Sequence, residues 1–87
     1  MKIEFDPEKN AKNIKERHIN FEIVNDFELN TAKIWLDNRK DYGEERYIAL
    51  GYIKKRLYSL VFTVRGTNLR VISLRKANKR EVKYYEK

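Results

Sequence analysis

The hydrophobic period of the chain changes at Thr31, and this change limits the folds that the chain can adopt. From that residue apolar and polar side chains alternate, as is typical of strands with one buried face. The alternation predicts a strand over residues 31–37, a charged loop over 38–45, and three longer strands over 46–54, 57–65 and 69–76. The segments 54–56 and 66–68 are short enough to be hairpin turns. The three longer strands should therefore pair antiparallel.

The register of these strands follows from the length assumed for the turns. With two three-residue turns, the expected core face carries Ile48, Leu50, Tyr52, Tyr58, Leu60, Phe62, Val64, Ile72 and Leu74. A two-residue second turn would instead set Arg75 beside Leu60 and Phe62, and burying that charge would cost several kcal/mol. The opposite face is then expected to carry small and basic side chains, namely Tyr47, Ala49, Gly51, Ser59, Val61, Thr63, Arg65, Val71, Ser73 and Arg75.

The segments on either side of these strands predict short strands and helices. Residues 2–5 alternate as a strand does, and Asp6-Pro7 is a helix start with a capping carboxylate, so a helix should run to about His18. Phe21, Val24 and Phe27 recur at helical spacing and indicate a second short helix. Residues 78–87 predict a C-terminal helix capped by an asparagine.

Together these elements predict one α+β domain over residues 1–87, in the order β-α-α-β-β-β-β-α. The two N-terminal helices should cover the apolar face of an antiparallel sheet. A chain of 87 residues leaves no room for a second domain. The other face, flanked by the C-terminal helix, would remain as a binding surface.

The charge of the chain points to a polyanionic partner. Its formal net charge is +7, and residues 51–87 contain only two acidic residues, so the positive excess lies there. Nucleic acid, an acidic protein and an anionic membrane would each suit such a field. However, the apolar runs are far shorter than the roughly 20 residues of a membrane span, and the N-terminus lacks the apolar core of a secretion signal. With no cysteine present, a cytoplasmic protein with no membrane partner is expected.

The residue types limit the chemistry that the chain can perform. It has no cysteine, a single histidine, no phosphate-binding glycine loop and no carboxylates at metal-binding spacing, so we expect neither a metal site nor a cofactor. What remains is a set of arginines, a few carboxylates and tyrosines. That set suits RNA cleavage, because RNA carries its own nucleophile in the 2′-hydroxyl and the protein needs only to align it, move protons and stabilise charge.

Arginines are the main candidates for contact with RNA. Arg65, Arg70 and Arg75 lie at the turn and along the last strand, and Arg80 follows in the C-terminal helix. Planar, permanently charged guanidinium groups bind phosphate through two hydrogen bonds and offset transition-state charge. Each could equally be a solvated arginine at the end of a strand.

Proton transfer has four candidates, each with a structural alternative. His18 could move protons near neutral pH, although a histidine at the end of a helix also favours the helix dipole. Glu44 and Glu45 could supply a general base, or could form a surface ion pair with Arg46. Tyr85 could stack on a base or donate to a phosphate oxygen, or could anchor its helix to the sheet.

The same residues fall into a familiar arrangement. The chain contains F5-D6-P7-E8-K9, then Asn13, H18-I19-N20-F21-E22, G43-E44-E45-R46-Y47-I48-A49-L50-G51 and R70-V71-I72-S73-L74-R75-K76-A77, followed by Glu81 and Y85-E86. This pattern resembles the BrnT toxin family over essentially the whole chain. Its most specific part is the strand bracketed by Arg70 and Arg75 and followed by a short basic helix.

The resemblance implies a RelE-like fold and a ribonuclease toxin of a type II toxin–antitoxin system that arrests growth by degrading RNA, free or on the ribosome. It implies neutralisation by a BrnA-like antitoxin, which would also make the contact with operator DNA. By position it implies the catalytic candidates Arg65, Arg75, Tyr85, Glu45 and His18 and the RNA-binding candidates Arg70, Arg80, Glu81 and Ser73.

Two other functions stay open from the residues alone. A non-enzymatic RNA-binding module would need the same basic face but no proton-transfer group. A protein-interaction domain would use that face only for an acidic partner. Cleavage of RNA in the presence of EDTA would be expected of a metal-independent ribonuclease and of neither the RNA-binding module nor the protein-interaction domain.

Overall fold

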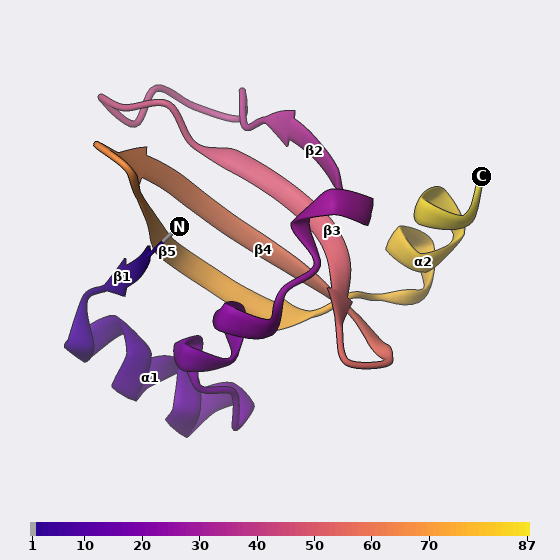
Figure 1. Cartoon of the computed structure of the whole chain (residues 1–87), viewed down its shortest axis with the longest axis horizontal. Coiled ribbons are helices and arrows are strands. Elements are labelled where there is room, and N and C mark those ends of the chain that lie inside the picture. Colours follow the sequence, from indigo (N-terminus) through magenta and orange to yellow (C-terminus); the bar gives the residue numbers. More distant parts are fainter. Residues whose placement is uncertain (1) are drawn as a thin grey trace.

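The computed structural model describes residues 2–87, which form a five-stranded sheet with helices on both faces (Figure 1). The elements are β1 (Lys2–Phe5), α1 (Pro7–Arg17), the 3₁₀ helices η1 (Phe21–Asp26) and η2 (Leu29–Thr31), β2 (Lys33–Leu36), β3 (Tyr47–Ile53), β4 (Arg56–Arg65), β5 (Asn68–Lys76) and α2 (Lys79–Glu86). The strand order is β1-β5-β4-β3-β2. The predicted α+β class is therefore confirmed.

The sheet is mixed, so the prediction of an antiparallel sheet was wrong at one edge. Strands β2 to β5 pair antiparallel, whereas β1 runs parallel to β5, with Ile3 opposite Leu69. A parallel pair needs a crossover connection. Here the crossover includes α1 and the antiparallel strands, and it brings the start of the described chain beside its last strand.

The prediction of a second N-terminal α-helix was also wrong. The residues concerned form η1, a 3₁₀ helix in which the Asn20 side chain accepts a hydrogen bond from the Glu22 backbone amide at 2.9 Å. Its buried residues Phe21 and Val24 are three positions apart, and Phe27 follows after three more. A spacing of three matches the three residues per turn of a 3₁₀ helix, so every third side chain faces the sheet.

Helix α1 begins and ends close to the expected positions. The Asp6 carboxylate accepts from the Glu8 amide at 2.9 Å, and the helix ends at His18, whose backbone is left-handed with φ 60°. Asn13 is the buried residue of this helix, and its amide donates to the carbonyls of Ile19 and Leu74, each at 3.0 Å. The hydrogen bond to Leu74 fixes α1 to β5, and the one to Ile19 holds the segment that follows the helix.

The first hairpin turn has two residues, so the register predicted for β3 was wrong. Ile53 pairs with Arg56, which leaves Lys54 and Lys55 as the turn, and Lys54 has the positive φ of 55° that tight hairpins require. Because the side chains of a strand alternate, removing one turn residue moves every β3 side chain to the other face. The core therefore receives Tyr47, Ala49, Gly51 and Ile53, while Ile48, Leu50 and Tyr52 face the opposite side.

The second hairpin also has a two-residue turn, Gly66-Thr67, but an irregularity between Val61 and Phe62 shifts the pairing back by one residue. Beyond the shift, Leu60 pairs with Leu74 and Ser59 pairs with Arg75. Arg75 thus stays off the core face, as predicted, although the assumed turn length was wrong. Val71, which was expected on the open face, is buried in the core instead.

The core between α1, η1 and the sheet is closely packed around Gly51. A Cβ atom at this position would lie 2.7 Å from Cζ of Phe27 and 3.0 Å from Cβ of Ala32. The missing side chain therefore allows Phe27 to lie directly on β3. Around it, the buried cluster includes Phe21, Leu60 and Leu74.

Helix α2 lies on the opposite face of the sheet from α1, and Figure 1 shows the two helices well apart. It begins with a capping box, in which the Asn78 side chain accepts from the Glu81 amide and the Glu81 carboxylate accepts from the Asn78 amide. A second apolar cluster docks it, formed by Leu50, Leu57, Tyr52, Ala77, Val82 and Tyr85. Within residues 2–87, no helix has the length and apolar content to cross a membrane.

Candidate functional site

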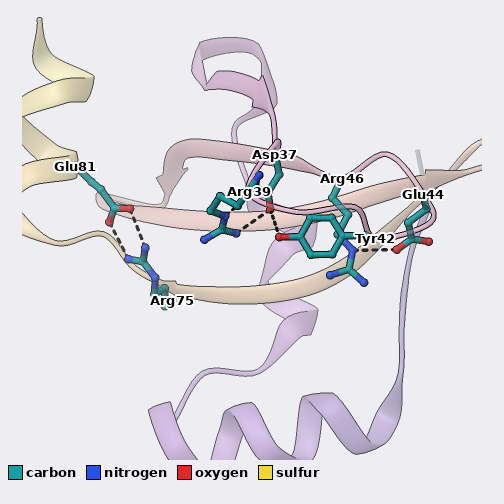
Figure 2. A network of polar contacts seen from close by, with 7 residues as sticks. All are labelled: Asp37, Arg39, Tyr42, Glu44, Arg46, Arg75 and Glu81. Carbon is teal, nitrogen blue, oxygen red and sulfur yellow. Dashed lines mark hydrogen bonds and ion pairs between the residues drawn. The ribbon is translucent and has the colours of Figure 1, made fainter.

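The face of the sheet that carries α2 also carries a row of arginines, which we call the arginine row: Arg39, Arg46, Arg65 and Arg75. Figure 2 shows Arg39, Arg46 and Arg75 along this face. Arg75 comes from β5 and Arg65 from the end of β4, while Arg39 and Arg46 come from the segment between β2 and β3. Arg75 faces this side because it pairs with Ser59, one position from the core pair of Leu60 and Leu74. Residues distant in sequence are thus gathered on one surface.

Arg75 forms a bidentate ion pair with Glu81 of α2. Its Nη1 lies 2.7 Å from Oε1 and its Nη2 lies 2.8 Å from Oε2. Hydrogen bonding to this carboxylate raises the pKa of Arg75, and the guanidinium holds the pKa of Glu81 below its usual range. Glu81 also accepts from the Asn78 amide at 2.9 Å. The first turn of α2 therefore fixes where the Arg75 guanidinium lies.

Arg39 is held by Asp37, whose side chain is only 1% exposed. The Asp37 carboxylate accepts from Nε and Nη2 of Arg39, both at 2.8 Å, from the Arg39 amide at 3.2 Å and from the Tyr42 hydroxyl at 3.1 Å. The Arg39 guanidinium holds the pKa of this carboxyl well below its usual range. The Arg39 side chain itself is 68% exposed, so its charge is fixed in place and presented to solvent.

Arg46 and Arg65 share the carboxylate of Glu44. Nε of Arg46 lies 3.0 Å from Glu44 Oε2, and Nη2 of Arg65 lies 3.8 Å from Oε1. The Arg46 guanidinium also stacks on the Tyr42 ring, at 4.2 Å from its centroid. Tyr42 thus links the Asp37 and Glu44 groups into one supported surface, as Figure 2 shows.

The structure brings several of the residues predicted from the sequence to this face. Arg65, Arg75 and Glu81 belong to it directly. Ser73 pairs with Val61 between them, and Arg70 pairs with Thr63 and lies 3.7 Å from Glu4 of β1. Arg80 follows on α2 and is exposed. The distances of 3.7 and 3.8 Å at Arg70 and Arg65 exceed hydrogen-bond length, so those two pairs are looser than the one at Arg75.

Three other predicted residues lie elsewhere or have a structural partner. His18 follows α1, which packs on the opposite face of the sheet. The Tyr85 hydroxyl donates to the Thr31 carbonyl at 2.8 Å, so this side chain anchors α2. The Glu45 carboxylate accepts from the Tyr47 hydroxyl at 3.4 Å, and Tyr47 belongs to the core face. Its neighbour Glu44 is the carboxylate that lies beside the arginines.

The segment between β2 and β3 was predicted only as a charged loop, and its contribution of side chains to the arginine row was not predicted. Asp37, Arg39 and Tyr42 give it a defined structure. The available signal was an aspartate directly after a strand with an arginine two positions later, because aspartate often bonds groups two residues on. No spacing rule indicated that this loop would reach β5.

Metal-ligating side chains are not clustered in the part of the chain that the structure describes. Residues 2–87 contain no group of three or more histidine, aspartate or glutamate side chains placed to hold a metal ion. The arginine row itself offers guanidinium groups, carboxylates and a tyrosine hydroxyl.

Guanidinium groups held on one face of a small α+β domain, as here, are typical of proteins that bind the phosphates of polyanions. Comparison with known proteins identifies the family. A family model described as "Ribonuclease toxin, BrnT, of type II toxin-antitoxin system" matches residues 5–81, so the chain belongs to the BrnT toxin family. The chain is a ribonuclease toxin whose system includes an antitoxin partner. No curated protein matches the sequence.

Proposed function

We propose that this toxin cleaves RNA at the arginine row without a metal ion, by attack of the 2′-hydroxyl on the adjacent phosphate. The observation that carries the proposal is that Arg39, Arg46 and Arg75 lie along one face of the sheet (Figure 2), with Arg65 beside Glu44 on the same face. An RNA strand crossing this face would meet a series of fixed positive charges. Arg70, Ser73 and Arg80 would extend its contact with the backbone on either side.

Arg75 and Arg39 are suited to bind the scissile phosphate. Each presents a planar guanidinium whose position is fixed by a carboxylate before substrate arrives. A phosphodiester offers two oxygens in the geometry that the Glu81 carboxylate now offers to Arg75, so the substrate would replace Glu81 there. Guanidinium groups fixed in advance stabilise the phosphorane charge without reorganising during the reaction.

Glu81 is the carboxylate that lies at Arg75, and once the phosphate has displaced it from the guanidinium it would accept the proton of the 2′-hydroxyl. Glu44 lies at the other end of the arginine row, between Arg46 and Arg65, where it would keep those two side chains in position. The 2′-oxygen would then attack phosphorus and form a 2′,3′-cyclic phosphate. The 5′-oxygen would leave and take a proton from solvent. Glu45 and His18 stay as alternative bases, to be tested by substitution.

We also propose a BrnA-like antitoxin as the inhibitor, acting in the cytoplasm, where both it and RNA are made. A protein that covers the arginine row would block RNA by occupying the same charges. Contact of the toxin–antitoxin pair with operator DNA would then come from the antitoxin, because the basic face of the toxin is covered.

The test is cleavage of end-labelled RNA by antitoxin-free toxin in EDTA. The expected products end in 2′,3′-cyclic phosphate, and a 2′-O-methyl RNA of the same sequence stays intact because it lacks the nucleophile. The double variant Arg39→Ala/Arg75→Ala, purified in parallel, controls for contaminating nuclease. Folded toxin that binds RNA but cleaves it neither free nor on ribosomes would contradict the proposal and favour a non-enzymatic binding module.

A further inference from the structure

A groove lies where α2 meets β2 and β3, beside the arginine row. Its volume is about 440 Å³, and it is lined by Trp35, Leu50, Arg80, Glu81 and Tyr84. Two aromatic rings form its walls, since Trp35 and Tyr84 meet edge to face with their centroids 5.8 Å apart. Both are unusually exposed for large aromatic side chains, Trp35 by 38% and Tyr84 by 51%. The core clusters described above leave these rings partly uncovered.

The position of the groove ties it to the arginine row. Trp35 pairs with Ile48 and Lys33 pairs with Leu50, so these β2 side chains face the same side of the sheet as Arg75. Glu81 lines the groove and also binds the Arg75 guanidinium. A nucleotide with its phosphate at Arg75 would therefore have the groove within reach of its base.

We infer that this groove is a subsite for one unstacked nucleobase of the bound RNA, an inference that rests on the proposed function. The faces of a base would stack against Trp35 or Tyr84 over the apolar side chain of Leu50. In the free protein Glu81 is paired with Arg75, and a phosphate that displaces it leaves Arg80 and Glu81 together at the rim of the groove. An aromatic slot beside the arginine row complements the planar base of a nucleotide whose phosphate is bound at that row.

Trp35 allows direct observation of binding, because it is the only tryptophan of the chain. The probe is a short 2′-O-methyl oligonucleotide, which binds without being cleaved, titrated against full-length toxin free of antitoxin. Stacking of a base should quench and shift the Trp35 fluorescence. An abasic oligomer with the same number of phosphates should bind more weakly and leave the emission nearly unchanged.

Substitutions test the aromatic walls separately from the charge. Trp35→Leu and Tyr84→Leu should each weaken binding of the oligonucleotide by roughly 5- to 100-fold, the range that loss of a stacking partner produces, and leave binding of the abasic oligomer unaltered. Ile34→Ala is the matched control, because Ile34 lies on the same strand, is 45% exposed and belongs to the other face. This variant should bind the oligonucleotide within about twofold of the wild-type affinity, because substitutions at exposed positions outside an interface usually have small effects.

Three results would overturn the inference. Equal quenching by the abasic oligomer, or unchanged affinity in Trp35→Leu, would mean that only phosphates are recognised. Loss of antitoxin inhibition in Trp35→Leu with unchanged RNA binding would identify the groove as a protein-docking surface instead. Cleavage assays in parallel distinguish failure of the base subsite from failure of the proposed function. Cleavage without base-dependent binding would contradict the subsite alone, whereas absence of cleavage would contradict the proposed function.

Discussion

The Arg75 side chain has a structural role and a proposed functional role. It connects α2 to the sheet through Glu81, and it is proposed to bind phosphate. Its ion pair with Glu81 lies at the surface, with side-chain exposures of 40% and 23%. Surface pairs contribute about 0–1 kcal/mol to folding. A fixed guanidinium in a catalytic site contributes far more to the rate. The two roles can therefore be separated experimentally.

Arg75→Ala should lower the rate of RNA cleavage by about 100- to 1000-fold, the usual cost of removing one group that stabilises transition-state charge. It should lower the free energy of unfolding by less than about 1 kcal/mol. Initial cleavage rates and thermal unfolding measure the two effects. Lys76→Ala, which removes the neighbouring charge on the other side of the strand, is the control. An Arg75→Ala protein that does not fold would show that the residue is structural.

Gly51 shows that a residue without a side chain can determine packing. Gly51→Ala should lower the free energy of unfolding by about 1–3 kcal/mol, because the added methyl group would overlap the ring of Phe27. Chemical denaturation measures this change. Gly43→Ala is a comparison variant in which nothing lies within 4 Å of the added atom. Its cost would come from the positive φ of 73° at Gly43 and not from steric overlap. A Gly51→Ala protein as stable as wild type would mean that Phe27 can move away freely.

Among the elements, the segment between β2 and β3 is held in a defined conformation by hydrogen bonds. Buried Asp37 accepts hydrogen bonds from two residues of the segment, and its own amide donates to the Arg46 carbonyl at 2.7 Å. Under the proposed function Asp37 is a positioning residue, which would act on RNA only through Arg39 and Tyr42. Its removal should affect alignment more than charge.

Asp37→Asn should lower cleavage by about 10- to 100-fold, because small displacements of aligned groups can cost about 100-fold in rate. Its pH dependence provides a second readout. A carboxyl whose pKa is depressed in the folded state stabilises the fold above the pKa of the unfolded chain, and this contribution is lost as the pH falls through the folded value. Wild type should therefore lose more stability than Asp37→Asn below about pH 4. Identical acid unfolding curves would contradict this.

For the other elements, alternation and helix caps in the sequence predicted some features of secondary structure and not others. The strands, the caps at Asp6 and Asn78 and the position of α2 were predictable, because alternation and capping depend on neighbouring residues. The 3₁₀ form of η1 was not predicted, because a spacing of three fits an α-helix and a 3₁₀ helix nearly equally over so few residues. The turn lengths of both hairpins were also missed.

Across the whole molecule, the chain has a net charge of +7, and the arginine row lies on the sheet face opposite to α1 and η1. Helix α1 and η1 cover the other face, and α2 covers only part of this one. The exposed positive charges are therefore available to a single bound strand.

RNA binding should depend steeply on salt. If the four members of the arginine row each neutralise one phosphate, the logarithm of the affinity should fall with the logarithm of salt concentration with a slope of about −3. Fluorescence anisotropy of a labelled 2′-O-methyl oligonucleotide measures this slope. Arg65→Ala should make it shallower by roughly 0.7. A slope near zero would indicate recognition without phosphate contacts.

From the amino-acid sequence alone, the order of the strands along the chain, the first helix, the place of Arg65 and Arg75 on one face and the family were predictable. The parallel pairing of β1, the face of every β3 side chain and the part played by Asp37, Arg39 and Tyr42 emerged only in the folded chain. The physical reason is that β3 is apolar on both faces: Ala49 packs against the core while Leu50 packs against α2. Alternation alone could not distinguish them, and only the hydrogen bonds between strands, set by the turn and the bulge, fixed the answer.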